Sequence, residues 1–259
     1  VGNGISFIIL IGIIARLPHA LIAEFNYRLI SASGGLVAFL AEIVFLLFVT
    51  AGAILLVQGT RKVPVQYAKR VVGNKQYGGA RQYIPLKVNA ANVMPIIFAQ
   101  AIMFIPISLA SYFTGGDGTP SRFIQVLSDN TSFWYNFIFA TLIILFTYFY
   151  TAITINPTQM ADDLKRNNGF IPGVKPGRST RDYLDGIMDR ITLPGAFFLA
   201  LVAIMPAFAQ ILGISSAFAQ FFGGTSLLIL VGVVLDTLQQ VESHLLMRHY
   251  DGLLKSGRI

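Results

Sequence analysis

The sequence has no cysteine, and only 12% of its 259 residues are charged. The absence of cysteine excludes disulfides, thiolate metal sites and a cysteine nucleophile. The low charge excludes an ordinary soluble surface, because an average soluble domain carries about twice this charged fraction. Since 54% of the residues are hydrophobic, the composition predicts a polytopic membrane protein.

Enzyme motifs are also missing. The sequence contains no H-E-x-x-H zinc motif, no G-x-S-x-G nucleophile elbow and no G-x-x-x-x-G-K-[ST] nucleotide loop. His244 and His249, two of the three histidines, are five residues apart and do not share a helix face. We therefore expect no catalytic site, no metal and no cofactor, and an energy source outside the chain.

Six apolar runs are long enough to cross a bilayer, which takes about 20 residues of helix. They show no period-two alternation, and this favours helices over a transmembrane barrel. The sequence therefore predicts an all-α polytopic membrane helix bundle. Its six spanning helices are expected at about residues 3–23, 35–59, 92–113, 133–155, 191–212 and 217–246.

Basic residues gather in alternate connections. Residues 60–91 and 156–190 form two long loops and residues 247–259 form a tail, and together they hold 16 of the 19 Lys and Arg residues. Basic connections stay on the cytoplasmic side of a membrane. We therefore expect both loops, the tail and both ends of the chain in the cytoplasm. The outer connections are then near residues 24–34, 114–132 and 213–222.

The first loop carries seven basic residues and no acidic one between positions 61 and 87. Val63 and Val65 alternate with polar residues up to the turn signal Gly73-Asn74, which predicts a hairpin-like finger. The charge alone supports two interpretations: a topology signal only, or a surface that also docks an acidic partner such as RNA, anionic lipid or a protein. The candidate docking residues in this loop are Arg61, Lys62, Lys69, Arg70 and Lys75.

The second loop is predicted to begin with a helix at residues 158–167 and to return to the membrane through a helix that begins near Thr180. Between them, two Pro-Gly pairs in residues 170–177 form a stiff turn that can hold Lys175 outward, and Arg178 follows. A plain tight turn without a binding role is the alternative.

Two carboxylates lie inside apolar runs, Glu42 and Asp236. A carboxylate at the centre of a span costs about 3 kcal/mol, so such residues are functional candidates. They suggest one alternative function, an ion-coupled secondary transporter. Simpler explanations exist for both: Glu42 can reach the interface from its helix end, and Asp236 can mark where the last helix leaves the hydrocarbon.

A third hypothesis is a wide conduit closed by a ring of branched apolar side chains, which dewets and demands no particular substrate. Ile5 and Ile9 lie one turn apart on one helix face. Ile97 and Ile229 lie about a third of the way into their own predicted helices. Most isoleucines in membrane helices face lipid or a neighbouring helix, so the pattern alone leaves this hypothesis open.

Six short motifs together resemble the SecY family, which forms the pore subunit of a protein-conducting channel. In the family's order they are GNGIS (2–6), YAKR (67–70), PLKVN (85–89), NP (156–157), FIPGVKPG (170–177) and FGGTSLLI (222–229). The resemblance covers the family's second half, its fifth to tenth helices. Because the chain also starts without Met, we expect it to be part of a longer one.

The resemblance implies a channel that passes unfolded secretory proteins and releases membrane segments through a lateral gate. Ile5, Ile9, Ile97 and Ile229 then resemble this half's share of a hydrophobic pore ring. The helix near residues 92–113 resembles one lip of the gate. The polar residues expected to line the gate are Asn3, Asn92 and Thr225.

The resemblance also implies partners and a location. The two loops resemble the docking site of the ribosome and the SecA motor, and small SecE-like and SecG-like membrane subunits are expected beside the chain in a bacterial cytoplasmic membrane. The family usually has Arg where this chain has Lys175, which keeps the charge but lacks the bidentate fork. The YAKR match makes docking, together with topology, the favoured interpretation of the first loop.

Overall fold

The computed structural model describes residues 4–30, 35–67, 70–72, 75–77, 81–113 and 129–256. They belong to two compact units, Val1–Ile54 with Val202–Ile259, and Leu55–Leu201. Five helices in the described residues are long and apolar enough to cross a membrane, and a shorter apolar stretch is Met94–Pro106. The predicted all-α polytopic membrane bundle is therefore confirmed, with short strands only in a loop region.

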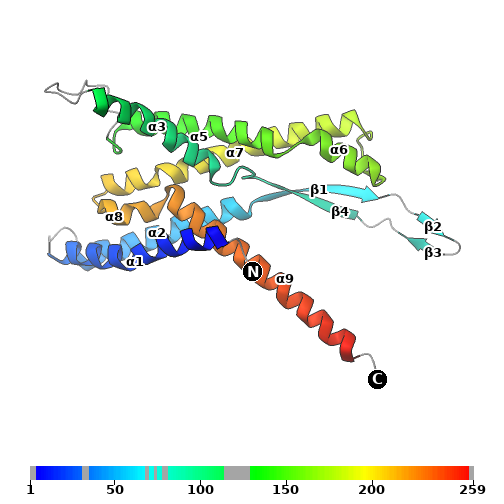
Figure 1. Ribbon diagram of the computed structural model, residues 1–259, viewed down its shortest axis with the longest axis horizontal. Coiled ribbons are helices and arrows are strands. Elements are labelled where there is room, and N and C mark those ends of the chain that lie inside the picture. Colours follow the sequence, from blue (N-terminus) through cyan, green and yellow to red (C-terminus); the bar gives the residue numbers. More distant parts are fainter. Residues whose placement is uncertain are drawn as a thin grey trace. The chain divides into compact units, whose positions relative to one another are not determined.

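The first unit contains α1 (Gly4–Ile30), most of α2 (Gly35–Gln58) and the second part of α7 (Arg178–Ile211). It continues with α8 (Ser216–Ala219), η1 (Gln220–Phe222) and the long α9 (Gly224–Ser256) (Figure 1). Its core is built around Phe218 and Phe222, whose rings meet edge to face with centroids 5.3 Å apart. Phe45 of α2 stacks on Phe222 and so fastens α2 to this core.

Gly223, between η1 and α9, permits a close approach inside this unit. A Cβ atom at this position would lie 2.1 Å from the carbonyl oxygen of Val202 in α7, which is too short for any side chain. The start of α9 can therefore pack directly on α7 only because residue 223 is glycine.

The second unit contains an antiparallel ribbon. β1 (Thr60–Tyr67) pairs with β4 (Arg81–Lys87), and β2 (Arg70–Val72) pairs with β3 (Lys75–Tyr77). These pairings confirm the predicted hairpin. Figure 1 shows β2 and β3 at the far end of the ribbon from the helices. The predicted turn at Gly73-Asn74 lies outside the described residues.

The helices of the second unit are α3 (Met94–Phe113), α5 (Phe133–Thr154), α6 (Pro157–Arg166) and the first part of α7, with a short strand β5 (Gly169–Phe170). Phe98 of α3 packs on Tyr150 of α5, with ring centroids 5.2 Å apart. The Asn156 side chain caps α6 by accepting hydrogen bonds from the backbone N–H groups of Thr158 and Gln159.

Several helices extend beyond the ends expected from hydropathy. α1 continues past residue 23 to Ile30, α7 begins at Arg178 instead of near 191, and α9 continues past residue 246 to Ser256. Hydropathy marks where a helix leaves an apolar environment, whereas backbone hydrogen bonding continues through the polar residues that follow. The helix predicted near Thr180 and the span predicted at residues 191–212 are therefore one helix.

Candidate docking surface and pore segments

The two long loops fold together as one body in the second unit. β1 pairs with β4 on one side and with β5 on the other, through Gln66 with Phe170 and Tyr67 with Gly169. A shared buried cluster lies beneath, made of Val63, Val65, Leu86, Leu164, Ile171, Leu184 and Met188. The sequence predicted each loop separately. The apolar face of β1, which needs a covering partner, was the signal that could have linked them.

Four of the five candidate docking residues of the first loop lie in strands of the antiparallel ribbon. Arg61 and Lys62 are exposed on β1. Arg70 and Lys75 lie in β2 and β3, at the far end of the ribbon in Figure 1. The side chains of these two residues, and all of Lys69, lie outside the described residues. Because no acidic residue occurs between positions 61 and 87, the ribbon carries an unopposed positive charge that attracts anionic partners.

The turn that carries Lys175 is fixed on both sides. Ile171 anchors it in the shared cluster, and Gly173 and Gly177 take left-handed backbone angles, with φ of 87° and 101°. The Thr180 hydroxyl donates a 2.9 Å hydrogen bond to the backbone carbonyl of Lys175. The Lys175 side chain is exposed, and so is that of Arg178 at the start of α7. Their part in docking stays a prediction.

The predicted pore-ring residues fall in both units. In the first unit, α1 packs against α9; Ile9 of α1 is 44% exposed and Ile229 of α9 is partly buried. Ile5 lies in α1, but its side chain is outside the described residues. In the second unit, Ile97 of α3 is 43% exposed. The ring that joins these residues stays a prediction.

The predicted gate-lining residues have different surroundings. Asn92 is exposed just before α3 and has a left-handed φ of 52°, and its backbone carbonyl accepts a hydrogen bond from the Asn89 side chain. Thr225 is partly buried in the first turn of α9. Asn3 lies outside the described residues.

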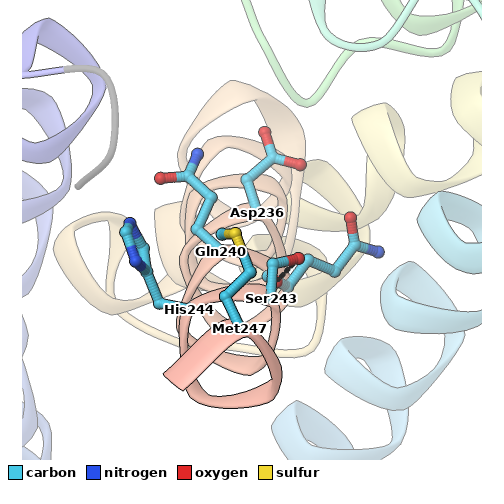
Figure 2. A pocket seen from close by; sticks show the side chains of 6 residues that line it. Asp236, Gln240, Ser243, His244 and Met247 are labelled. Carbon is cyan, nitrogen blue, oxygen red and sulfur yellow. Dashed lines mark hydrogen bonds between the residues drawn. The ribbon is translucent and has the colours of Figure 1, made fainter. Parts of the chain in front are cut away.

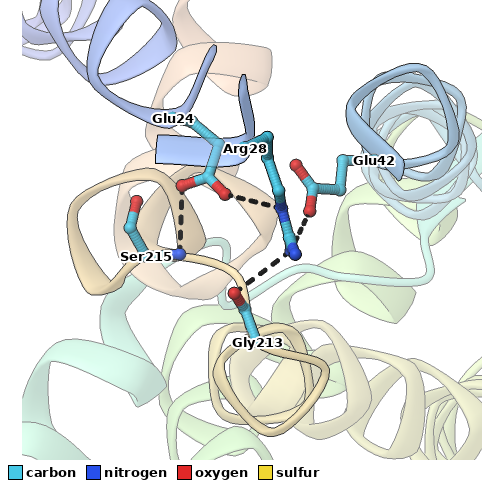
Figure 3. A network of polar contacts seen from close by, with 5 residues as sticks. All are labelled: Glu24, Arg28, Glu42, Gly213 and Ser215. Carbon is cyan, nitrogen blue, oxygen red and sulfur yellow. Dashed lines mark hydrogen bonds and ion pairs between the residues drawn. The ribbon is translucent and has the colours of Figure 1, made fainter. Parts of the chain in front are cut away.

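A buried charged network joins three parts of the first unit (Figure 3). Arg28 of α1 donates hydrogen bonds to the Glu42 carboxylate of α2 and, at 3.1 Å, to the carbonyl of Gly213. The Nε of Arg28 lies 3.2 Å from the Glu24 carboxylate, which also accepts the Ser215 N–H at 3.1 Å. Glu24 is fully buried, and Arg28 and Glu42 are more than nine-tenths buried. The network ties α1 and α2 to the turn between α7 and α8.

The sequence did not predict this network. Residues 24–34 were expected in an outer connection, but Glu24 and Arg28 lie within α1. Two signals could have revealed it: the i,i+4 spacing of Glu24 and Arg28, and the need of a carboxylate at Glu42 for a cation inside an apolar helix. A buried charge that is hydrogen-bonded and paired is a structural element, because removing either partner leaves an uncompensated charge.

Asp236 lies on a polar face of α9 (Figure 2). A surface hollow on this face is lined by Asp236, Gln240 and His244 at spacings of four residues, and by Gln239, Ser243 and Met247. Asp236 is exposed. A polar face at this point is expected where a helix leaves the hydrocarbon.

Two solved structures share the fold of the chain. One is described as the structure of a protein-conducting channel (TM-score 0.61, 16% identity, covering 94% of this chain and 59% of that one). The other comes from work on the plug domain of the SecY protein (TM-score 0.60, 15% identity, 94% of this chain and 60% of that one). The fold therefore defines the class: a polytopic helical membrane protein.

The family model of SecY matches residues 1–238. The SecY translocase subunit of Mycobacterium bovis is 43% identical over 262 residues, covering 98% of this chain and 58% of its own length. That of Chlamydia muridarum is 41% identical over 263 residues, covering all of this chain and 57% of its own length. The chain belongs to the SecY family, and it spans somewhat more than half the length of these relatives.

The alternative of an ion-coupled transporter finds no support in these relatives or in the structure. Glu42, one of its two proposed carboxylates, is held by Arg28 inside the buried network. Asp236, the other, is exposed on the polar face of α9. The two carboxylates therefore have separate structural explanations.

Proposed function

We propose that the chain forms half of a protein-conducting channel that passes unfolded polypeptides across a membrane and releases membrane segments through a lateral gate. The observation that carries this proposal is the match to the SecY family along residues 1–238. In this proposal α3 forms one lip of the gate, and Asn3, Asn92 and Thr225 contribute polar groups near it.

The pore in this proposal is closed by apolar contact. Ile5, Ile9, Ile97 and Ile229 contribute branched side chains that offer a moving chain no fixed hydrogen bond, so that any sequence can pass. The same side chains pack around the translocating chain and repel water from the empty pore, which limits ion leak. The remaining part of the ring comes from helices outside this chain.

The folded body of the two loops is the proposed docking site. The positive charge of its ribbon, which no acidic residue opposes between positions 61 and 87, suits the ribosome or the SecA motor, and the turn at Lys175 offers one more cation. The direction of transport then comes from the partner, through nucleotide hydrolysis by the motor or polypeptide synthesis by the ribosome. We further propose SecE-like and SecG-like subunits beside the chain, a bacterial cytoplasmic membrane as its location, and both chain ends in the cytoplasm, because basic loops are retained there.

Site-specific crosslinking tests the channel. A photo-crosslinking amino acid in place of Ile97 is expected to capture a stalled translocating polypeptide. The control position is Ile102, which is exposed on the same helix but points about 140° away from Ile97. Capture of only lipid or a neighbouring helix at position 97 would overturn the pore assignment.

A further inference from the structure

A cavity of about 300 Å³ in the second unit has no part in the proposed channel. It lies where α5 ends and α6 begins, beside the first part of α7. Its polar lining comes from Tyr148, Thr151, Asp185, Asp189 and Thr192, and the rest of its wall is apolar. The cavity therefore combines two carboxylates, three hydroxyl groups and a hydrophobic surface.

Neither carboxylate of this cavity is neutralised from within. Asp185 and Asp189 lie one turn apart on the same face of α7, so their charges repel each other. Within the described part of the chain the ion pairs involve Arg28, Glu24 and Glu42, and none involves Asp185 or Asp189. A cation bound between the two carboxylates would remove the repulsion.

Two buried threonines give an independent indication of a ligand. Thr151 is 7% exposed and Thr192 is 2% exposed, and both line the cavity. Thr141, Thr147 and Thr237 each donate to the carbonyl four residues earlier. Thr151 and Thr192 have no such bond, nor any other side-chain hydrogen bond to a described residue. Both hydroxyl groups line the cavity, so a ligand there would supply the hydrogen bonds that the described residues do not.

The position of the cavity along the membrane normal follows from the charges of the helices that line it. All of α5 is uncharged, and so is α7 from residue 191 to 211, whereas α6 and the first turns of α7 carry many charges. Charged side chains avoid hydrocarbon, so the cavity lies at the level where the lipid headgroups begin. Tyr148 suits that level, because tyrosine is enriched at membrane interfaces.

We propose that this cavity binds the ammonium group of a phosphatidylethanolamine headgroup. A primary ammonium has three N–H donors, which can reach the Asp185 and Asp189 carboxylates and a threonine hydroxyl. The face of the Tyr148 ring can add a cation–π contact. Phosphatidylcholine offers no N–H donor, and phosphatidylglycerol carries no cation.

The neighbouring residue Arg190 favours a lipid over a lysine of a protein partner. Arg190 is exposed and directly follows Asp189 at the end of the charged part of α7. It lies outside the cavity lining, about 100° around the helix from Asp189, and in this proposal its long side chain meets the lipid phosphate, whereas it would repel a lysine side chain. A zwitterionic headgroup matches both the two carboxylates and the arginine beside them.

Native mass spectrometry of the purified full chain tests this proposal. The chain is offered equal amounts of phosphatidylethanolamine, phosphatidylcholine and phosphatidylglycerol, and selective retention of phosphatidylethanolamine is expected. The double variant Asp185→Asn with Asp189→Asn is expected to lower that retention about tenfold, because it removes both charge-assisted contacts to the ammonium group. The matched control is Asp182→Asn, which changes an exposed carboxylate of the same helix outside the cavity lining.

Two further variants connect retention to the cavity itself. Thr192→Val keeps the side-chain volume but removes the hydroxyl, and a smaller loss of about threefold is expected. Because the natural chain has no cysteine, Ala152→Cys provides a single thiol on the cavity wall, and a bulky maleimide there should displace the lipid. The control is Ser179→Cys, which places the thiol at an exposed position outside the cavity lining, where the maleimide should leave the lipid bound.

Equal retention of the three lipids would overturn the proposal, and so would unchanged retention in the double Asn variant. A separate carbodiimide experiment in native membranes gives the third contrary result, which is crosslinking of Asp185 to a lysine of a protein partner. The measurement does not involve transport, so its failure would leave the channel proposal untouched.

Discussion

Two groups of carboxylates in the molecule differ in how their charge is met. Glu24 and Glu42 are buried around Arg28, and the Ser215 N–H of the α7–α8 turn donates a further hydrogen bond to Glu24. Asp185 and Asp189 line an open cavity and have no ion pair within the described residues. The protein itself supplies a cation for the first group, whereas the second group lies open to a ligand.

The difference teaches how position determines the role of a charge in this membrane protein. A buried carboxylate without a cation is too costly to persist, so the fold must supply its partner. A carboxylate at the membrane boundary keeps part of its hydration and can stay unpaired until a ligand arrives. Stability should therefore depend on the Arg28 network, and binding on the Asp185 cavity.

The largest effect is expected when the buried network around Arg28 loses its cation. Arg28→Met leaves two buried carboxylates without a cation, and the free energy of unfolding should fall by about 3–5 kcal/mol. Denaturant titration in detergent measures the change. The control is Arg16→Met, which removes an exposed arginine from the same helix. Equal losses in the two variants would contradict a special role for the network.

A triple variant sharpens this result. Glu24→Gln, Arg28→Met and Glu42→Gln together remove every charge of the network, and much of the stability lost in Arg28→Met should return, since a buried ion-pair group can often be replaced by uncharged side chains without net loss. A triple variant as unstable as Arg28→Met would show that shape, and not charge, determines the effect.

A smaller effect is expected from the basic residues of the ribbon. Reversing Arg70 and Lys75 to Glu should weaken binding of the ribosome or SecA, and the loss should shrink at high salt because exposed charges are screened within about 8 Å at physiological ionic strength. Binding titrations at two salt concentrations measure it. Unchanged binding with intact membrane topology would argue against docking at this ribbon.

The open cavity should contribute little to stability. Asp185→Asn with Asp189→Asn removes a like-charge pair from an accessible position, so the free energy of unfolding should change by less than about 1 kcal/mol. The same denaturant titration tests this. A loss as large as that of Arg28→Met would mean that the cavity carboxylates are structural and would remove the contrast between the two groups.

The smallest effect concerns Asp129, a third kind of carboxylate, exposed in the turn before α5. Hydrogen bonds from the Thr131 hydroxyl and from its backbone N–H lower the pKa of Asp129 below its usual value. Because the folded-state pKa is depressed, this contribution to stability is present above the unfolded pKa and is lost as the pH falls through the folded one. Thr131→Val should raise the pKa of Asp129, which an NMR titration can detect; an unchanged pKa would exclude the hydroxyl as a cause.

Local features of the fold could be predicted from the sequence. The alternation around Val63 and Val65 indicated the ribbon, and the helix predicted at residues 158–167 is α6 at Pro157–Arg166. These features depend on contacts close in sequence, where periodicity and capping chemistry are sufficient. The family was indicated by short sequence motifs, which are likewise formed by residues close together in the sequence.

Long-range contacts could not be predicted. β1 pairs with β5 across about a hundred residues, and Arg28 reaches Gly213 across a sequence separation of 185. No local period records such a pairing, because the partner is selected by packing in three dimensions. The joined loops and the Arg28 network were missed for this reason.

Ion conductance tests the central claim, an apolar pore ring, most directly. In planar bilayers containing the protein, Ile9→Ser together with Ile229→Ser should raise the resting ion leak several-fold, because a hydroxylated constriction holds water. The matched control is Ile8→Ser with Val234→Ser, which alters exposed apolar residues of the same two helices. A leak that rises only in the ring variant is the predicted result, and a leak unchanged from that of the natural protein would contradict the account.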